Sequence, residues 1–137
     1  MKSFRSILLL LLSAVILIVT CSCGDVSNVK ITESESQIYT EQEINSAVKT
    51  AKNYFRQNFS GCKLLTIGYA GDDSGEEAAE WAKTYEADKA IILISDFEVD
   101  SSGGDGSLEP SSTYTDWKWI LVKDNNGLWR HATHGYG

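Results

Sequence analysis

Acidic side chains surround a stretch rich in Ser and Gly in the second half of the chain. Asp96, Asp100 and Asp105 stand among these small residues, and Glu109 follows them. Hard cations such as calcium take carboxylate oxygens from flexible loops, but this spacing does not match an EF-hand. We therefore favour a solvated loop whose Asp and Ser side chains bond their own backbone. No metal and no other cofactor is expected.

Two histidines, His131 and His134, are the second candidates for chemistry. Imidazoles bind metals and transfer protons near neutral pH. In a regular strand, however, residues three apart point to opposite faces, so one strand cannot aim both rings at one metal. No second His or Cys pair completes a zinc set, and no nucleophile motif accompanies either ring. Each is predicted to be an individual sheet residue, with His134 against Trp119.

Aromatic side chains gather near the C-terminus and could form a binding surface. They are Tyr114, Trp117, Trp119, Trp129 and Tyr136. Aromatics with polar tips favour recognition surfaces and pocket linings, whereas the alternative is sheet core packed on a helix. Both faces of this segment carry bulky residues, and only one face can meet a helix. Trp117, Trp119, His134 and Tyr136 are therefore named as candidate ligand-binding residues.

The start of the chain has the pattern of a signal peptide. Lys2 and Arg5 precede an apolar run over residues 7–19. Such a run suits a signal peptide and is short for a helix that crosses a bilayer. An anchor that stays attached is the alternative. It is disfavoured because small residues and cysteines follow the run, and a basic stop-transfer cluster does not.

The segment over residues 19–24, VTCSCG, resembles a lipobox, the processing site of bacterial lipoproteins. In that family the cysteine thiol is diacylated and becomes the new N-terminus, and the residue before it is small. Ser22 before Cys23 meets this pattern better than Thr20 before Cys21. Cys23 is thus the predicted lipid attachment, with Cys21 as the alternative because Ile18 stands three residues before it. Two acyl chains give durable anchoring, so the resemblance implies a cell-membrane location on the extracytoplasmic face.

The composition of the mature chain limits its partners. Removal of residues 1–22 leaves 10 basic and 19 acidic residues, a formal charge of −9. Nucleic acid is not expected as a partner, because phosphate binding needs a basic patch. Of the three cysteines only Cys62 would remain beside the acylated one, so no intramolecular disulfide is available. Its thiol is predicted to be a small core residue.

The predicted organisation has a signal peptide over 1–22, an acylated N-terminus with a polar tether over 23–37, and one globular domain over 38–137. Thr40 and Glu43 form a capping box that opens an amphipathic helix ending at Gly61. Apolar residues recur along this helix at helical spacing. They are Ile44, Ala47, Val48, Ala51, Phe55 and Phe59.

The remaining elements are shorter. A strand is predicted over 62–70, a helix over 76–85, a strand buried on both faces over 90–99 and a loop over 100–112. Strands over 117–123 and 128–133 flank Asn126-Gly127, a strong hairpin signal. A two-residue turn there pairs Trp119 with His134 and Leu121 with Ala132. A longer loop would shift this register.

The order of these elements predicts an α+β fold, in which an N-terminal amphipathic helix packs on a curved antiparallel sheet of about four strands, with a second short helix. This plan is similar to the cystatin-like or nuclear transport factor 2-like fold, although the cystatin motif Gln-x-Val-x-Gly is missing. The chain also resembles a group of small uncharacterised lipoproteins of Gram-positive, clostridia-type bacteria, which implies fold and location but no activity. The matching segments lie over 95–97, 101–108, 112–114, 117–122 and 135–137.

Three functional hypotheses follow. The first is a non-enzymatic binding or interaction module whose partner is a wall component, another envelope protein or a small ligand in the concavity of the sheet. The second is an enzyme that uses Asp96 or His134 there. The third is a structural surface protein that makes contacts through the loop over 100–112. A deep pocket that holds an Asp or His with a shifted pKa would favour the enzyme. A shallow aromatic patch would favour the binding module.

Overall fold

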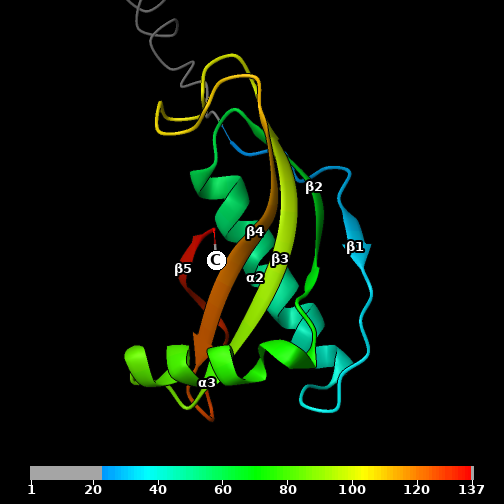
Figure 1. Cartoon of the computed structure of the whole chain (residues 1–137), viewed down its shortest axis with the longest axis vertical. Coiled ribbons are helices and arrows are strands. Elements are labelled where there is room, and N and C mark those ends of the chain that lie inside the picture. The colour runs from blue at the N-terminus through cyan, green and yellow to red at the C-terminus, as the bar shows by residue number, and fades with distance from the viewer. Residues whose placement is uncertain (1–22, 137) are drawn as a thin grey trace, which may run out of the picture.

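The computed structural model describes residues 23–136, so the predicted signal peptide and Cys21 lie outside the described residues. The fold is α+β, with two helices and a five-stranded sheet in the order β1-β2-β3-β4-β5 (Figure 1). Its elements are β1 (Lys30–Thr32), α2 (Glu41–Asn58), β2 (Cys62–Tyr69), α3 (Gly75–Thr84), β3 (Lys89–Val99), β4 (Thr113–Lys123) and β5 (Arg130–Gly135). Neither helix in this part of the chain is long and apolar enough to cross a membrane.

The helix α2 begins at the predicted capping box. The Thr40 hydroxyl accepts from the Glu43 amide at 3.1 Å, and the Glu43 carboxylate accepts from the Thr40 amide at 2.9 Å. Its apolar stripe lies buried against the sheet, with Ala51 and Phe55 fully covered. Gly61 follows the helix at φ 72°, a backbone conformation that glycine adopts without strain, and turns the chain into β2.

The two faces of the sheet have separate cores. Ile91 and Leu93 of β3 face α2, whereas Ile92 packs with Ala78 and Ala82 of α3. The strand is thus buried on both faces, as its continuous apolar run predicted. The longer helix lies across one face, and the shorter helix α3 covers one end of the other face (Figure 1).

The segment over 23–37, predicted as a flexible tether, is in part bound to the folded domain. Strand β1 pairs in parallel with β2, with Ile31 opposite Ile67. The Asp25 amide donates to the Cys62 carbonyl at 2.8 Å, and its carbonyl accepts from the Leu64 amide at 2.9 Å. An open sheet edge offers unpaired backbone groups that even a polar segment can satisfy. A strand therefore precedes the helix, and the sheet is mixed.

The hairpin between β4 and β5 differs from the predicted two-residue turn. Trp119 pairs with His134 as predicted, but Leu121 pairs with His131 where Ala132 was expected. The connection runs over residues 124–129, and the register shifts between Ile120 and Leu121. This shift is a β-bulge on β5, which places one extra residue against its partner strand.

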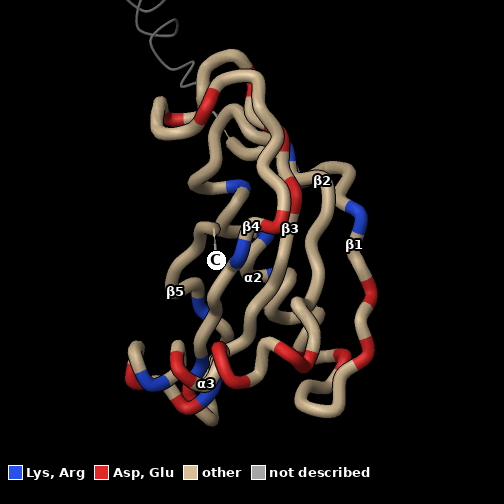
Figure 2. Tube along the Cα trace, in the orientation of Figure 1, with Lys and Arg blue, Asp and Glu red and all other residues tan. Residues whose placement is uncertain are grey.

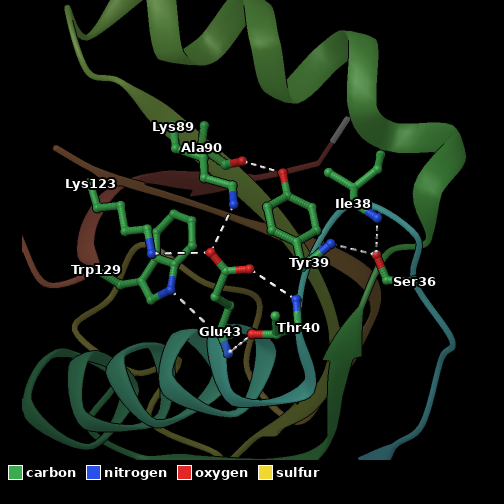
Figure 3. A network of polar contacts seen from close by, with 9 residues as sticks. All are labelled: Ser36, Ile38, Tyr39, Thr40, Glu43, Lys89, Ala90, Lys123 and Trp129. Carbon is green, nitrogen blue, oxygen red and sulfur yellow. Dashed lines mark hydrogen bonds and ion pairs between the residues drawn. The ribbon is translucent and has the colours of Figure 1, made fainter. Parts of the chain in front are cut away.

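A polar network ties the start of α2 to the sheet (Figure 3). The Glu43 carboxylate lies 2.8 Å from the Lys89 ammonium and 3.3 Å from that of Lys123. Hydrogen bonding from Lys89 is the main reason why the pKa of Glu43 falls to about 2. The Trp129 indole donates to the Glu43 carbonyl at 3.1 Å, which draws the 124–129 connection onto the helix. One side chain thus joins α2, β3 and β4.

Candidate functional site

A pocket of about 460 Å³ lies where the end of α2, the loop over 100–112 and the last two strands meet. Its volume is in the range of small-molecule sites. The residues that line it come from all four segments. They are Tyr54, Asn58, Phe59, Ser60, Gly104, Asp105, Ser107, Leu108, Trp117 and His134.

The indole of Trp117 has no hydrogen-bond partner. Its side chain is 8% exposed, and its Nε1 is the one buried side-chain nitrogen or oxygen in residues 23–136 that lacks a partner. Buried indole N–H groups usually donate a hydrogen bond. In contrast, Trp119 donates to the Ser95 hydroxyl at 2.7 Å and Trp129 donates to Glu43. The protein therefore leaves one buried donor unpaired, and this donor belongs to a residue that lines the pocket.

The two histidines lie on one face, which corrects the prediction that they point to opposite faces. The His131 Nε2 and the His134 Nδ1 are 2.9 Å apart. The bulge on β5 adds a residue between them, so the strict alternation of a regular strand fails there. His131 stacks on Tyr54 with ring centroids 3.6 Å apart, and His134 stacks on Trp117 at 5.7 Å.

Burial favours the neutral form of both rings. Burial lowers the pKa of His131 to about 4, and the neighbouring His134 adds to this shift. Burial also lowers the pKa of His134. A neutral imidazole has one nitrogen that donates and one that accepts. Since Nδ1 of His134 is engaged with His131, its other nitrogen is the one left to meet a ligand.

Of the three aspartates proposed as a weak metal site, Asp100 and Asp105 bind the loop itself and Asp96 binds strand β4. Asp100 accepts from the Ser102 amide and Asp105 from the Ser107 amide, each at 2.9 Å. Hydrogen bonds from the two serine side chains lower the pKa of both carboxyls. Asp96 accepts from the amide of Asp116 at 3.0 Å. Backbone bonding by Asp in this loop is thus confirmed, and no group of three metal-ligating side chains occurs in the described part of the chain.

The structure divides the four candidate ligand-binding residues. Trp117 and His134 line the pocket, whereas Trp119 is fully buried in the core beneath α2. Tyr136 is 65% exposed and packs on Trp117 with ring centroids 5.2 Å apart, outside the lining of the pocket. Trp119 is therefore a core residue. This agrees with the alternative given above for the aromatic group, which was sheet core packed on a helix.

The contribution of α2 to the pocket was missed in the sequence. Tyr54 and Asn58 are one turn apart and lie beside the apolar stripe, and neither was named as a candidate. They line the pocket together with Phe59 and Ser60. The i, i+4 spacing of Tyr54 and Asn58, next to Phe55 and Phe59, was the available signal of a wider aromatic face.

The charge of the lining restricts the ligand. Asp105 is the one charged residue that lines the pocket, and its lining includes no Lys or Arg. A phosphate or carboxylate ligand would find no cation there, and a buried or half-buried charge needs a partner. The aromatic rings and uncharged polar groups instead suit a neutral molecule that has both an apolar face and hydroxyl groups.

A second cavity of about 560 Å³ lies between the segment over residues 31–37 and the start of α2. Its lining includes Glu33, Glu35 and Glu41 on exposed chain. The buried, unpartnered indole of the first pocket has no counterpart among the described side chains at this second cavity. The first pocket is therefore the better candidate site.

The two described cysteines have different environments. Cys23 is exposed, and Cys62 is buried. Burial is the main reason why the pKa of the Cys62 thiol rises to about 11. A thiol with this pKa carries almost no thiolate at neutral pH, so Cys62 is the inert core residue that was predicted.

Comparisons of this chain with protein-family models, with curated proteins and with solved structures each gave no match.

Proposed function

We propose that this protein is a lipid-anchored binding protein on the extracytoplasmic face of the cell membrane, and that its pocket binds a neutral, hydroxyl-rich ligand of the saccharide class. One observation carries the choice of site. The Trp117 indole N–H is buried without a partner, and Trp117 lines the pocket together with His134. A buried donor without a partner costs free energy, and a ligand oxygen would satisfy it.

The lining has the groups that a saccharide needs. The rings of Tyr54, Phe59 and Trp117 are part of the lining, so the C–H groups of a sugar in the pocket would contact aromatic carbon. The Asn58 amide and the Asp105 carboxylate can exchange hydrogen bonds with hydroxyl groups. A saccharide combines both features, so we choose a saccharide over an envelope protein as the ligand.

The membrane anchor is supported by the pattern at the start of the chain. A basic start, an apolar run and the lipobox-like residues before Cys23 occur in the order that lipoprotein processing requires. Cys23 is exposed beside the folded domain, where acyl transfer could reach it. The long α2 helix on the antiparallel strands β2 to β5 also supports the proposed relation to cystatin-like or nuclear transport factor 2-like folds and to the small clostridia-type lipoproteins.

Mass spectrometry of the exported protein tests the anchor. We expect a diacylated Cys23 at the N-terminus, and we expect Cys23→Ala to release the protein from the membrane fraction. Cys21→Ala is the matched control and should leave the protein on the membrane. An unmodified N-terminus that retains Lys2 would contradict the anchor, and release by Cys21→Ala alone would move the lipid to that residue.

The pocket is tested by the indole N–H resonances in a nitrogen–proton correlation spectrum. Oligomers of N-acetylglucosamine and of glucose serve as probes. The Trp117 resonance should shift on addition of a binding saccharide, whereas those of Trp119 and Trp129 should stay, because their donors are already engaged. No shift of the Trp117 resonance with either series would count against the saccharide class.

An enzyme that uses His134 as a general base is the second candidate. It is favoured by the lowered pKa of His134 and by the hydrogen bond that orients its ring through His131. Glycoside hydrolysis usually needs two carboxyl groups on either side of the bond, and only Asp105 lines the pocket. Asp96, the other candidate, does not line it. Product release from the probe saccharides that His134→Gln abolishes would favour the enzyme over the binding protein.

A further inference from the structure

The chain is bonded to the folded domain from Gly24 onward, so no flexible segment separates Cys23 from the domain. The Gly24 amide donates to the Arg56 carbonyl at 2.9 Å, and Asp25 then pairs with the start of β2. Gly24 is buried, and a Cβ added there would lie 2.5 Å from the Phe55 carbonyl oxygen. One residue spans about 3.5 Å, so a lipid on Cys23 stays close to the end of α2.

The pocket lies at this same end of the domain. Phe59 and Ser60 line it, and the Phe59 carbonyl is 3.0 Å from the position of an added Gly24 Cβ. The loop over 100–112 lies at this end of the domain, whereas α3 and the 124–129 connection lie at the opposite end (Figure 1). Strand β3 links the two ends with 11 residues, which corresponds to roughly 35 Å at the usual rise of a strand.

We infer that the acylated domain stands on the membrane with its pocket end toward the lipid, and that the ligand is the saccharide head group of a membrane lipid. This inference rests on the proposed lipid anchor and on the proposed saccharide pocket. A head group reaches the pocket without leaving the bilayer surface. Wall saccharides farther from the membrane meet the opposite end of the domain.

The charge at the pocket end sets how closely the domain approaches the lipid. Asp100, Asp105 and Glu109 lie on the loop at this end, where Figure 2 shows a run of acidic residues. An anionic membrane surface repels such a loop. The anchor therefore holds the pocket end of the domain near the lipid head groups. Repulsion of the acidic loop keeps this end from inserting between the head groups. The pocket therefore stays hydrated.

A fluorescent label at either end tests the orientation. Ser101→Cys and Asn126→Cys place the label on exposed residues at the two ends, and Cys62 does not compete because its thiol is buried. The lipidated proteins are placed in vesicles of phosphatidylglycerol and phosphatidylethanolamine that contain a head-group spin-labelled lipid. The label at 101 should lose fluorescence, and the label at 126 should keep it. Equal quenching at both positions would overturn the orientation.

A longer connection provides the matched control. Insertion of about 20 Gly and Ser residues between Cys23 and Gly24 gives a flexible connection with a mean reach of roughly 25 Å. The difference between the two labels should then disappear. If the difference in quenching persists, the bonding of Gly24 to the domain does not set the orientation on the membrane, and this part of the inference is wrong.

The source of the saccharide is tested with the same lipidated protein. Vesicles that contain a glucosyl diacylglycerol should raise the unfolding midpoint of the wild type and not that of Trp117→Phe, because a ligand stabilises only the state that binds it. Free methyl glucoside at equal total concentration should give a smaller rise, because it is not concentrated at the bilayer surface beside the pocket. An equal rise with the free sugar would overturn the membrane-borne ligand and leave the saccharide pocket standing. No rise of the unfolding midpoint with the glycolipid vesicles or with the free sugar would contradict a glucosyl head group as the ligand. The lipid anchor is tested separately, by the acyl group that mass spectrometry detects.

Discussion

The Nε2 of His131 and the Nδ1 of His134 lie 2.9 Å apart on the face of β5 that meets α2. The extra residue of the bulge brings both rings to this face, where His131 stacks on Tyr54. The shift leaves the pairing of His134 with Trp119 unchanged, and His134 stacks on Trp117 and lines the pocket. One irregularity in the shortest of the antiparallel strands therefore brings His131 onto α2, beside a residue of the pocket wall.

The histidine pair makes stability depend on pH. The folded pKa of His131 is about 4, below the unfolded value of about 6.5. The unfolded chain therefore binds a proton that the folded chain excludes. The free energy of unfolding should be highest above pH 6.5 and should fall as the pH drops from there toward 4.

Ring titration by NMR measures this directly, and denaturant unfolding at several pH values measures its effect on stability. His131→Phe keeps a ring against Tyr54 and removes one titrating group, so its stability should fall less steeply between pH 6.5 and 4. A His131 ring that titrates near 6.5 in the folded protein would show that this account of its burial is wrong.

The carboxylate of Glu43 should contribute about 1 to 2 kcal/mol through its bonds to the two lysines. Glu43→Gln retains a side chain that can complete the capping box but removes the charge. The folded pKa of Glu43 is about 2, below its ordinary value of 4.5. The stabilisation is therefore present above pH 4.5 and is lost as the pH falls toward 2. Unfolding curves of the two proteins should converge in that range, and a constant difference down to pH 2 would contradict the assignment.

Trp119 is the central core side chain. It is fully buried and donates to the buried Ser95 hydroxyl. Trp119→Ala should lower the free energy of unfolding by about 3 to 5 kcal/mol. Leu128→Ala is the control, because Leu128 is 87% exposed and its loss should leave the melting temperature unchanged. An unchanged melting temperature for Trp119→Ala would contradict its place in the core.

Gly68 permits β1 to pair with the sheet. A Cβ at this position would lie 1.9 Å from the Thr32 hydroxyl oxygen. Gly68→Ala should displace β1, with faster amide exchange over residues 30–32 and a core that stays folded. Gly127→Ala is the matched control, since its Cβ meets nothing closer than 3.4 Å. Unchanged protection of residues 30–32 in Gly68→Ala would show that β1 tolerates the added methyl group.

The parts of the fold that local rules determine could be predicted from the sequence. The capping box at Thr40 predicted the start of α2, and the continuous apolar run before Asp96 predicted a strand buried on both faces. Burial of Cys62 followed from its apolar context. These features depend on residues that are close together in the chain, so they can be predicted from a single sequence.

The remaining features depend on contacts between distant segments. Strand β1 has a polar sequence and joins the sheet because β2 has an open edge. The bulge on β5 changes the register of a hairpin whose connection is bonded to α2 through Trp129, a contact between distant segments. The pocket was predicted in part through Trp117 and His134, but its other wall comes from a helix whose Tyr54 and Asn58 do not stand out from its polar side.

The most direct test of the proposed site is the affinity for the N-acetylglucosamine disaccharide, measured by titration calorimetry on three proteins. The wild type should bind it. Trp117→Phe, which keeps the aromatic face and removes the indole donor, should bind about tenfold more weakly, the effect of one hydrogen bond. Trp81→Phe, on the helix that packs on the other face of the sheet, should bind like the wild type. Equal affinity of Trp117→Phe and the wild type, or no heat with any of the three, would contradict the proposal that Trp117 marks a saccharide site.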